Sequence, residues 1–493
     1  MRVRHTAYLY ILIGITGVIL FFFGLGKRDF WGTPEARTAE IAREMLESGE
    51  WLVPHLNGMP RLTKPPLYFW SVAVLARAVN DDVITEYIAR IPAAVCAVGV
   101  LFFIMAIGTM VYDRRTGFYT ALICATMFSF FSYARYALLD MMLVFFETAM
   151  VFFFIRGMTY PERKKSSYCA LYLCAAGALY VKGPVGLFVP FMGIVVYLWK
   201  SRRLSEVRAL NPLLGISCAL MCVLPWVLYV YKTVPDIWGV ISHETVNRFF
   251  NPYDHIRSFL HFIFQTPFCM MPWTVCIPLV VWDIVKHRRL KSYLFPVSFF
   301  LPAFLFFSLC PSKQSHYLLP LYPFMALAVS KALQNFAVYA RARSKESLFC
   351  RLTCPTPLKA GVVAAGIFLG ILGYMVLIPW LNSRISVEPF CRQLDKIIKP
   401  EDHLVAFDYA KPYFCFYLRR IIPEILTEEE LEEYLIEYSA YVIMERENWE
   451  KLGHINGHVV LNYENDKDKI VVIKKGSPHA RFITRTFNHN TCI

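Results

Sequence analysis

Residues 90–111 read RIPAAVCAVGVLFFIMAIGTMV, and after Arg90 this stretch carries no charged side chain. A membrane-spanning helix needs about 20 consecutive apolar residues, so the stretch is long enough to cross a bilayer. The whole chain has the same character, because 56% of its 493 residues are hydrophobic and only 18% are charged. A soluble domain cannot bury that much apolar surface, and the sequence therefore predicts a polytopic α-helical membrane protein.

Ten further apolar runs on either side of this stretch are long enough to be spans. They cover residues 7–26, 117–132, 137–157, 168–181, 183–199, 209–231, 262–284, 293–310, 317–339 and 358–381. The first of them follows Arg2 and Arg4 and is longer than the core of a signal peptide, which predicts a retained signal anchor. A shorter run at 67–80 would bring the number of spans from eleven to twelve.

The Lys and Arg clusters decide between eleven and twelve spans. They lie within residues 114–115, 156–165, 200–208, 286–291 and 341–345. Eleven spans with a cytoplasmic N-terminus place every cluster on the cytoplasmic side, as the positive-inside rule requires. Twelve spans would turn these clusters outward unless the basic N-terminus also faced outward. We therefore predict eleven spans and interpret 67–80 as a helix held against the bundle or at the membrane interface. The net charge of +14 then reflects cytoplasmic loops and contacts with anionic membrane lipids, not nucleic acid.

The polar tail after about residue 382 differs from the rest of the chain. Short runs typical of strands at 404–407, 441–444, 459–461 and 470–473 surround an acidic amphipathic helix near 427–438. This alternation predicts a small C-terminal α/β domain. The predicted organisation is a transmembrane domain at 1–381, with a first outer loop at 27–89, and an outward (periplasmic) domain at 382–493. No cysteine spacing suggests zinc, and only Cys391 and Cys415, in the tail, are plausible disulfide partners.

The first outer loop contains a predicted helix. Residues 33–46 read TPEARTAEIAREML, in which Pro34 favours a helix start and Ala39, Ala42 and Met45 fall on one face. An ordinary amphipathic helix lying on the bilayer would show the same pattern.

Four charged residues lie at predicted membrane edges on the outer face: Asp140, Lys182, Arg248 and Lys313. Charges at such depth are costly, so their gathering on one side predicts a functional site. For the two lysines the alternative is that they only reach toward lipid headgroups.

Several of these residues belong to short blocks that occur in a recognisable order. The blocks are EIAREMLESGEWLVPHLNG (40–58), KPPLYFW (64–70), ALLD (137–140), VKGP (181–184), ETVNRF (244–249), PW (272–273) and KQSHYLLP (313–320). Together they resemble the GT-C membrane glycosyltransferases, specifically the branch with the lipid A 4-amino-4-deoxy-L-arabinose transferases and the dolichyl-phosphate-mannose protein mannosyltransferases. The resemblance covers roughly residues 7–340, and the first block is its most specific part.

The resemblance implies a monomeric glycosyltransferase of a bacterial inner membrane. It would move a single sugar from a polyprenyl (undecaprenyl) phosphate donor to an outer-face acceptor, such as lipid A or another envelope glycan. Alternatives are a protein O-glycosyltransferase or an oligosaccharide polymerase or ligase with a lipid-linked donor. A transporter or lipid flippase is the alternative from another class, although the chain has no repeated halves.

This chemistry assigns roles to particular residues. Cations must neutralise the charge that develops on the leaving phosphate, and the candidates for this role are Arg37, Lys64, Arg248 and Lys182. An acceptor hydroxyl needs a carboxylate base, for which Glu35 is the first candidate and Asp140 the second. The resemblance adds Glu244, Lys313 and Tyr317 to the substrate cavity.

The chain departs from the family in three places. Pro34 stands where the family has an Asp before the Glu that corresponds to Glu35. Thr63 and Thr245 stand where relatives hold a metal through Glu and His, so no cofactor is predicted, with a divalent metal left as the alternative. The aminoarabinose transferases also have two more spans before their terminal domain, which leaves the acceptor open.

Overall fold

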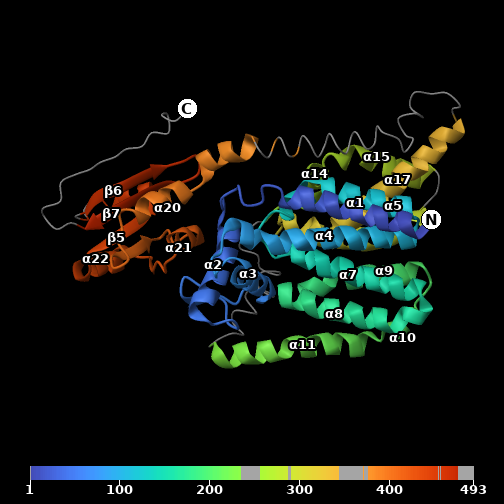
Figure 1. The fold of residues 1–493 in the computed structure, drawn as a ribbon, viewed down its shortest axis with the longest axis horizontal. Helices are drawn as coiled ribbons and strands as arrows, with labels where there is room; N and C mark the ends of the chain where they lie inside the picture. The colour runs from blue at the N-terminus through green and yellow to red at the C-terminus, as the bar shows by residue number, and fades with distance from the viewer. Residues whose placement is uncertain are drawn as a thin grey trace. The chain divides into compact units, whose positions relative to one another are not determined.

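The computed structural model describes residues 2–234, 256–286, 290–343, 370, 373, 376–452, 455 and 457–475. The chain divides into two compact units (Figure 1). The first, called the helical unit, comprises Met1–Leu25, Leu62–Val74 and Arg90–Leu372. The second, called the mixed unit, comprises Gly26–Arg61, Leu75–Ala89 and Gly373–Ile493.

Long apolar helices make up the helical unit, and several run side by side in Figure 1. The helices are α1 (Arg2–Phe22), α4 (Glu86–Val111, whose first turn belongs to the mixed unit), α5 (Arg114–Thr126), α6 (Phe128–Tyr133), α7 (Asp140–Thr159), α8 (Lys164–Lys182), α9 (Val185–Lys200), α10 (Glu206–Leu210), α11 (Pro212–Thr233), α14 (His261–Cys269), α15 (Ile277–Lys286), α16 (Leu290–Leu309) and α17 (Tyr322–Arg343). Helix α3 (Leu67–Val79) also begins in this unit, and it confirms that the run 67–80 is helical.

Four helices in the described part of the chain are long and apolar enough to cross a membrane. They are Glu86–Val111, Asp140–Thr159, Glu206–Thr233 and Lys291–Leu309, and a fifth is counted if His261–Cys269 and Trp273–Val285, bent by 111°, form one span. Shorter apolar helices are Ala7–Phe22, Leu67–Val79 and Val185–Lys200. The predicted run 117–132 is broken at the extended residue Met127, and 358–381 lies mostly outside the described residues. The number eleven stays a prediction.

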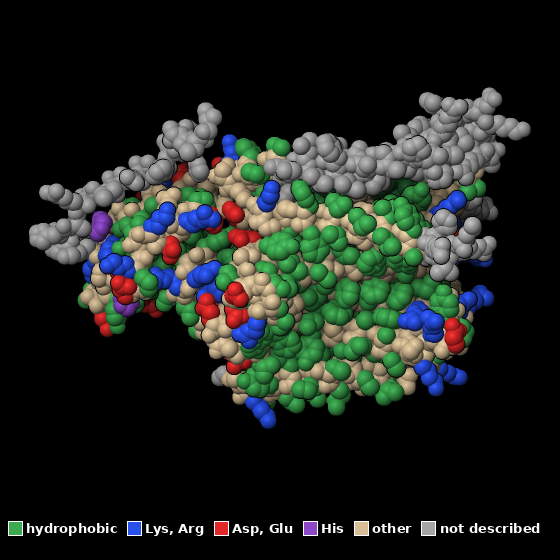
Figure 2. Space-filling view, viewed as in Figure 1, with side chains coloured by type: hydrophobic (Ala, Val, Ile, Leu, Met, Phe, Trp, Pro, Cys, Tyr) green, Lys and Arg blue, Asp and Glu red, His purple; other side chains and the backbone are tan. Residues whose placement is uncertain are grey.

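The surface of the helical unit is apolar where a soluble protein would be polar. Figure 2 shows hydrophobic side chains over a broad band of its visible face, with Lys and Arg side chains gathered at one end, near α10. Large side chains on the helices are highly exposed, among them Leu213 at 84%, Val275 at 80% and Leu309 at 72%. So extended an apolar surface is typical of contact with lipid.

Two buried arginines bind backbone carbonyls at the end of α1 and in the segment that directly follows it. Arg90 donates from Nη1 to the carbonyl of Leu25 at 3.0 Å. Arg135 donates to the carbonyls of Leu20, at 2.7 Å, and Phe23, at 2.8 Å. The last carbonyls of a helix have no partner within it, and cations suit the negative end of its dipole. Both arginines therefore have a structural role.

A five-stranded mixed sheet forms the C-terminal part of the mixed unit, with strand order β4-β3-β5-β7-β6. The strands are β3 (His403–Phe407), β4 (Glu424–Ile425), β5 (Ala440–Glu445), β6 (Gly457–Glu464) and β7 (Lys469–Lys475). Strands β4, β3 and β5 run parallel, whereas β7 is antiparallel to both β5 and β6. The helices are α20 (Glu388–Asp395), α21 (Pro412–Leu418), α22 (Glu428–Glu437) and α23 (Arg446–Lys451). All four predicted strand runs and the predicted acidic helix are present.

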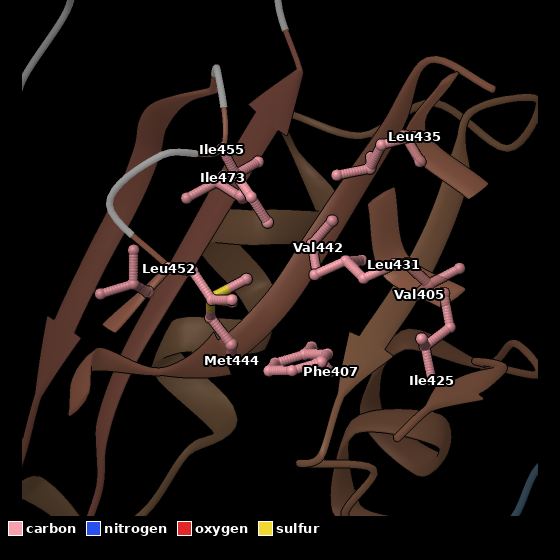
Figure 3. Close-up of a cluster of buried hydrophobic side chains, with 12 residues drawn as sticks. Val405, Phe407, Ile425, Leu431, Leu435, Val442, Met444, Leu452, Ile455 and Ile473 are labelled. Atoms are coloured by element: carbon pink, nitrogen blue, oxygen red, sulfur yellow. The ribbon is translucent and has the colours of Figure 1, made fainter. Parts of the chain in front are cut away.

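Apolar side chains from the sheet and from α22 form the core of this domain, as Figure 3 shows. Val442, Leu431 and Ile473 are fully buried in it. Burial of one such side chain contributes roughly 1.5–3 kcal/mol. The two cysteines considered for a disulfide, Cys391 and Cys415, are buried free thiols.

The first outer loop supplies the other part of the mixed unit. Helix α2 (Thr33–Ser48) begins with Pro34 in its first turn, as predicted, and packs against α21. A hairpin of β1 (His55–Leu56) and β2 (Met59–Pro60) follows.

The hairpin turn is made by Asn57 and Gly58, which both have positive φ, at 56° and 76°. Asn-Gly is the preferred pair for a two-residue turn of this kind. The Glu44 carboxylate accepts hydrogen bonds from both backbone N–H groups, at 2.5 Å and 3.0 Å. The Asn57 side chain in turn exchanges two hydrogen bonds with the backbone of Ile422. The loop and the C-terminal domain are thereby joined within one unit.

Candidate functional site

A short, little-exposed ion pair in the helical unit joins α7 to α8. Asp140 is the first residue of α7 and Lys182 is the last of α8. The two helices are consecutive and packed together, so the start of one meets the end of the other. Lys182 Nζ donates to Asp140 Oδ1 at 2.7 Å. A carboxylate at a helix N-terminus and an ammonium at a C-terminus also complement the two helix dipoles.

A third polar segment meets this ion pair. The 3₁₀ helix η4 (Ser315–Leu321) packs against α7, and His316 Nε2 lies 4.0 Å from Asp140 Oδ1. Lys64 is near enough for its charge to act on Asp140. We call Asp140, Lys182, His316 and Lys64 the polar cluster.

Sequence reasoning overlooked His316 as a site residue, although its block, KQSHYLLP, was recognised. Four of the short blocks, those that contain Lys64, Asp140, Lys182 and His316, therefore contribute to one place.

A second buried carboxylate follows on α7. Glu147 is 3% exposed and lies seven residues after Asp140, on the same helix face. Its Oε2 makes no hydrogen bond within the described part of the chain. Lys182 and Asp140 both act on it electrostatically. The sequence did carry a signal for it, because Glu147 lies inside the apolar run 137–157, where an ionisable side chain is costly and indicates a functional site.

Lys313 and Tyr317 were predicted to line the substrate cavity, and the structure gives them local contacts. Lys313 is 3% exposed and donates to the backbone carbonyls of Arg257, at 3.0 Å, and Cys310. Tyr317 packs its ring against Phe307, with centroids 5.8 Å apart. These contacts connect the segment after α16 to neighbouring segments. Lys313 is therefore held by structural contacts of its own.

The first candidate base, Glu35, lies in the mixed unit, in the first turn of α2. Its Oε2 forms a 2.5 Å ion pair with Nη2 of Arg28, and both side chains are 7% exposed. The Arg28 guanidinium also lies 5.1 Å from the centre of the Trp31 ring. Arg28 is a second residue that sequence reasoning missed. Its position directly after the first apolar run, in Lys27-Arg28-Asp29, was the available signal.

Of the other predicted site residues, some lie within the residues that the structure describes and some lie outside them. Arg37 is half-buried on α2 in the mixed unit, and Lys64 is half-buried in the helical unit. Arg248 and Glu244 lie outside the described residues. So does Thr245, one of the two positions considered for a metal, whereas Thr63 is half-buried next to Lys64. In the ranges that the structure describes, no three His, Cys, Asp or Glu side chains are placed to hold a metal ion.

The polar cluster combines groups that can stabilise an anion with groups that can accept a proton. Lys64 and Lys182 supply positive charge that can stabilise an anion. Both act on Asp140, which, like its neighbour His316, can accept a proton. Separately, the Arg28 contact in the mixed unit holds the Glu35 carboxylate in one orientation.

Sequence comparison finds that the chain is similar to proteins named as sugar transferases. Residues 15–241 match the family described as dolichyl-phosphate-mannose-protein mannosyltransferase. The chain is 28% identical over 327 residues to the undecaprenyl phosphate-alpha-4-amino-4-deoxy-L-arabinose arabinosyl transferase 2 of Proteus mirabilis, covering 65% of this chain and 58% of that protein. The corresponding transferase of Aeromonas salmonicida is 27% identical over 333 residues, with 66% and 60% covered. The chain thus spans less than two thirds of the length of these relatives.

Solved structures give the fold. ArnT from Cupriavidus metallidurans, crystallised with undecaprenyl phosphate, superposes with a TM-score of 0.77 at 20% identity, covering 95% of this chain and 98% of that one. The archaeal oligosaccharyltransferase AglB from Archaeoglobus fulgidus has a TM-score of 0.55 at 10% identity, with 95% and 74% covered. These likenesses confirm a polytopic helical membrane fold of the GT-C type. Together with the sequence matches they confirm the resemblance drawn from the motifs.

Proposed function

We propose that the chain transfers a single sugar from a polyprenyl phosphate to an acceptor at the outer face of a bacterial inner membrane. The observation that carries this proposal is the polar cluster, because its residues come from four separate blocks of the motif series, in a chain similar to named sugar transferases. The acceptor we propose is lipid A or another envelope glycan, and the protein acts as a monomer.

The reaction needs charge neutralisation more than covalent chemistry. As the bond between sugar and phosphate breaks, negative charge grows on the phosphate, and fixed cations stabilise it. Lys64, Lys182, Arg37 and Arg248 serve this purpose in the proposal. Glu35 accepts the proton of an acceptor hydroxyl, or orients an acceptor phosphate that is already ionised. Direct displacement inverts the configuration at the sugar carbon.

The test uses the purified full-length chain in lipid nanodiscs with a polyprenyl-phosphate sugar and lipid A. We expect release of free polyprenyl phosphate and an acceptor heavier by one sugar in mass spectrometry. Glu35→Gln should nearly abolish both, while Glu429→Gln, the same change on the exposed face of α22, should leave them intact. Donor movement across the bilayer without release of polyprenyl phosphate would instead identify a transporter. Addition of several sugars at once would identify a polymerase or ligase.

The acceptor is identified separately in cells. Mass spectrometry of lipid A and of other envelope glycans from a strain that lacks the gene should show the loss of one sugar from one of them. Loss of a sugar from protein alone would replace lipid A with a protein acceptor.

Two further parts of the proposal have direct tests. We propose eleven spans with the N-terminus in the cytoplasm, so a cysteine placed at Thr85 should react with an impermeant reagent added from the periplasm. Labelling of that cysteine from the cytoplasm alone would contradict the arrangement. We also propose that no metal is needed, because Thr63 and Thr245 stand at the two positions where the resemblance implies metal ligands. Transfer should therefore persist in EDTA.

A further inference from the structure

A polar pocket with a volume of about 360 Å³ lies within the mixed unit. This volume falls within the range of roughly 300–1,000 Å³ that is typical of small-molecule sites. The first outer loop forms one part of its wall, and the helices α20 and α21 of the C-terminal domain form another. None of its lining residues is among those proposed above for the transfer reaction.

The wall of this pocket carries many charges of both signs. Five carboxylates line it: Asp29, Glu47, Asp82, Glu86 and Glu388. Three guanidinium groups, those of Arg43, Arg392 and Arg419, lie among them. Two negative charges are thus in excess. A phosphate or another anion is therefore disfavoured here, and so is an apolar ligand, because it would strip water from these charges.

Neighbouring contacts hold much of this wall in place. Arg43 donates to Glu47 at 2.5 Å, and the Tyr417 hydroxyl donates to Glu86 at 2.9 Å. Arg392 is ion-paired with Glu388 on one face of α20. Groups held in this way lose little freedom when a ligand binds.

Arg419 differs from the other two arginines. It ends α21 with a positive φ of 51°, and its exposed side chain makes no hydrogen bond or ion pair within the described residues. Its guanidinium is therefore the donor most available to a ligand.

We infer that this pocket binds a saccharide unit that is neutral or carries an ammonium group. Sugar hydroxyls both donate and accept hydrogen bonds, so a wall that contains both carboxylates and guanidinium groups can satisfy them. Two aromatic residues, Phe416 and Tyr417, also line the pocket, and aromatic side chains are suited to the C–H face of a sugar. The further step, that this saccharide is part of the acceptor, rests on the proposed function.

The experiment measures binding without transfer. Saturation-transfer NMR on the full-length protein in nanodiscs compares glucosamine, glucose and glucose 6-phosphate. We expect affinity to fall in that order, because the wall has an excess of negative charge. Arg419→Asn removes the guanidinium but keeps a residue that tolerates a left-handed backbone. It should weaken glucosamine binding about tenfold, the effect of losing one hydrogen bond to a charged group.

Glu388→Gln is the second variant and should weaken glucosamine binding by a similar factor. Glu429→Gln, on the exposed face of α22, is the matched control and should bind glucosamine as the unchanged protein does. Tighter binding of glucose 6-phosphate, no binding of any of the three sugars, or a glucosamine affinity in both pocket variants equal to that of the unchanged protein would each overturn the inference.

The outcome is separable from that of the proposed function. A preparation that binds glucosamine through Arg419 and Glu388 but releases no polyprenyl phosphate would retain the pocket and refute the transfer reaction. If both variants instead transfer sugar at unchanged rates and bind saccharide as the unchanged protein does, the transfer reaction is retained and the pocket is refuted.

Discussion

Lys182 Nζ lies 2.7 Å from Asp140 Oδ1, and the two side chains are only 14% and 10% exposed. The contact forms where α8 ends and α7 begins, between two helices that a three-residue 3₁₀ turn, η1 (Pro161–Arg163), connects at their other ends. An ion pair so little exposed cannot lose one partner without leaving the other charge poorly solvated.

The first prediction concerns this pair. Asp140→Asn and Lys182→Met should each lower the melting temperature clearly, since breaking a buried pair costs about 3–5 kcal/mol. The double variant should be more stable than the sum of the two losses implies, because no charge is then left alone. Thermal unfolding in detergent measures all three. Strictly additive losses would show that the two residues do not interact.

The second prediction concerns Arg28 and Glu35. Arg28→Ala leaves the buried Glu35 carboxylate without this cation, so single-turnover sugar transfer should fall at least about tenfold. Arg28→Lys keeps the charge but loses the planar guanidinium and its contact with Trp31, so its loss should be smaller. If the Ala variant is present at a normal protein level and transfers sugar as the wild type does, orientation of Glu35 by Arg28 is not part of the mechanism.

The third prediction distinguishes a structural Lys313 from one that lines the substrate cavity. Lys313→Met removes two hydrogen bonds to backbone carbonyls and should lower stability by about 1–3 kcal/mol. The affinity for the polyprenyl-phosphate donor should not change by more than about twofold. The opposite result, weaker donor binding at an unchanged melting temperature, would restore Lys313 to the substrate cavity.

The fourth prediction concerns pH. Burial raises the pKa of the Glu40 carboxyl in α2 from 4.5 to about 7, against the lowering effect of its hydrogen bond and charge interaction with Arg43. The folded protein therefore holds this proton more tightly than the unfolded chain does. The free energy of unfolding should fall as the pH rises from about 4.5 to about 7 and stay level above that.

Glu40→Gln should flatten this part of the stability curve, and Glu429→Gln should leave it unchanged. Melting temperatures measured between pH 4.5 and 8 provide the comparison. A Glu40→Gln curve that coincides in shape with that of the unchanged protein would contradict the assignment.

The fifth prediction concerns the hairpin turn. Gly58 has a φ of 76°, and an added Cβ would lie 3.3 Å from Cδ1 of Ile421. Gly58→Ala should therefore lower the free energy of unfolding by about 1–2 kcal/mol, which would be visible as a lower melting temperature. Gly49→Ala is the matched control, because Gly49 has a φ of 71° but open space at its Cβ. An equal loss in both variants would assign the whole cost to the backbone.

Much of the local structure could be predicted because its signals lie within short stretches of chain. Pro34 marks the start of α2, and the strand runs around Val405, Val442 and Ile473 appear in the observed sheet. Asn57-Gly58 has the composition of the turn that it forms. In each case neighbouring residues set the backbone preference, and tertiary contacts did not override it.

The candidate site was harder to predict, because its geometry joins distant segments. The blocks that contain Asp140, Lys182 and Lys64 were recognised one by one, yet only the packing of α7, α8 and η4 identifies His316 as their neighbour. Arg28, although only seven residues from Glu35, becomes informative only when both side chains are seen to be buried.

By itself, the sequence determined that the chain is a helical membrane protein with a small α/β tail, and it identified the motif blocks. Hydropathy and turn chemistry act over a few to about twenty residues, so one-dimensional patterns carry them. The tertiary structure alone decided that the first outer loop packs with the C-terminal domain, through Asn57 and Ile422, and that together they enclose a charged pocket. Such pairings depend on which distant surfaces bury one another, and no local pattern in the chain records that choice.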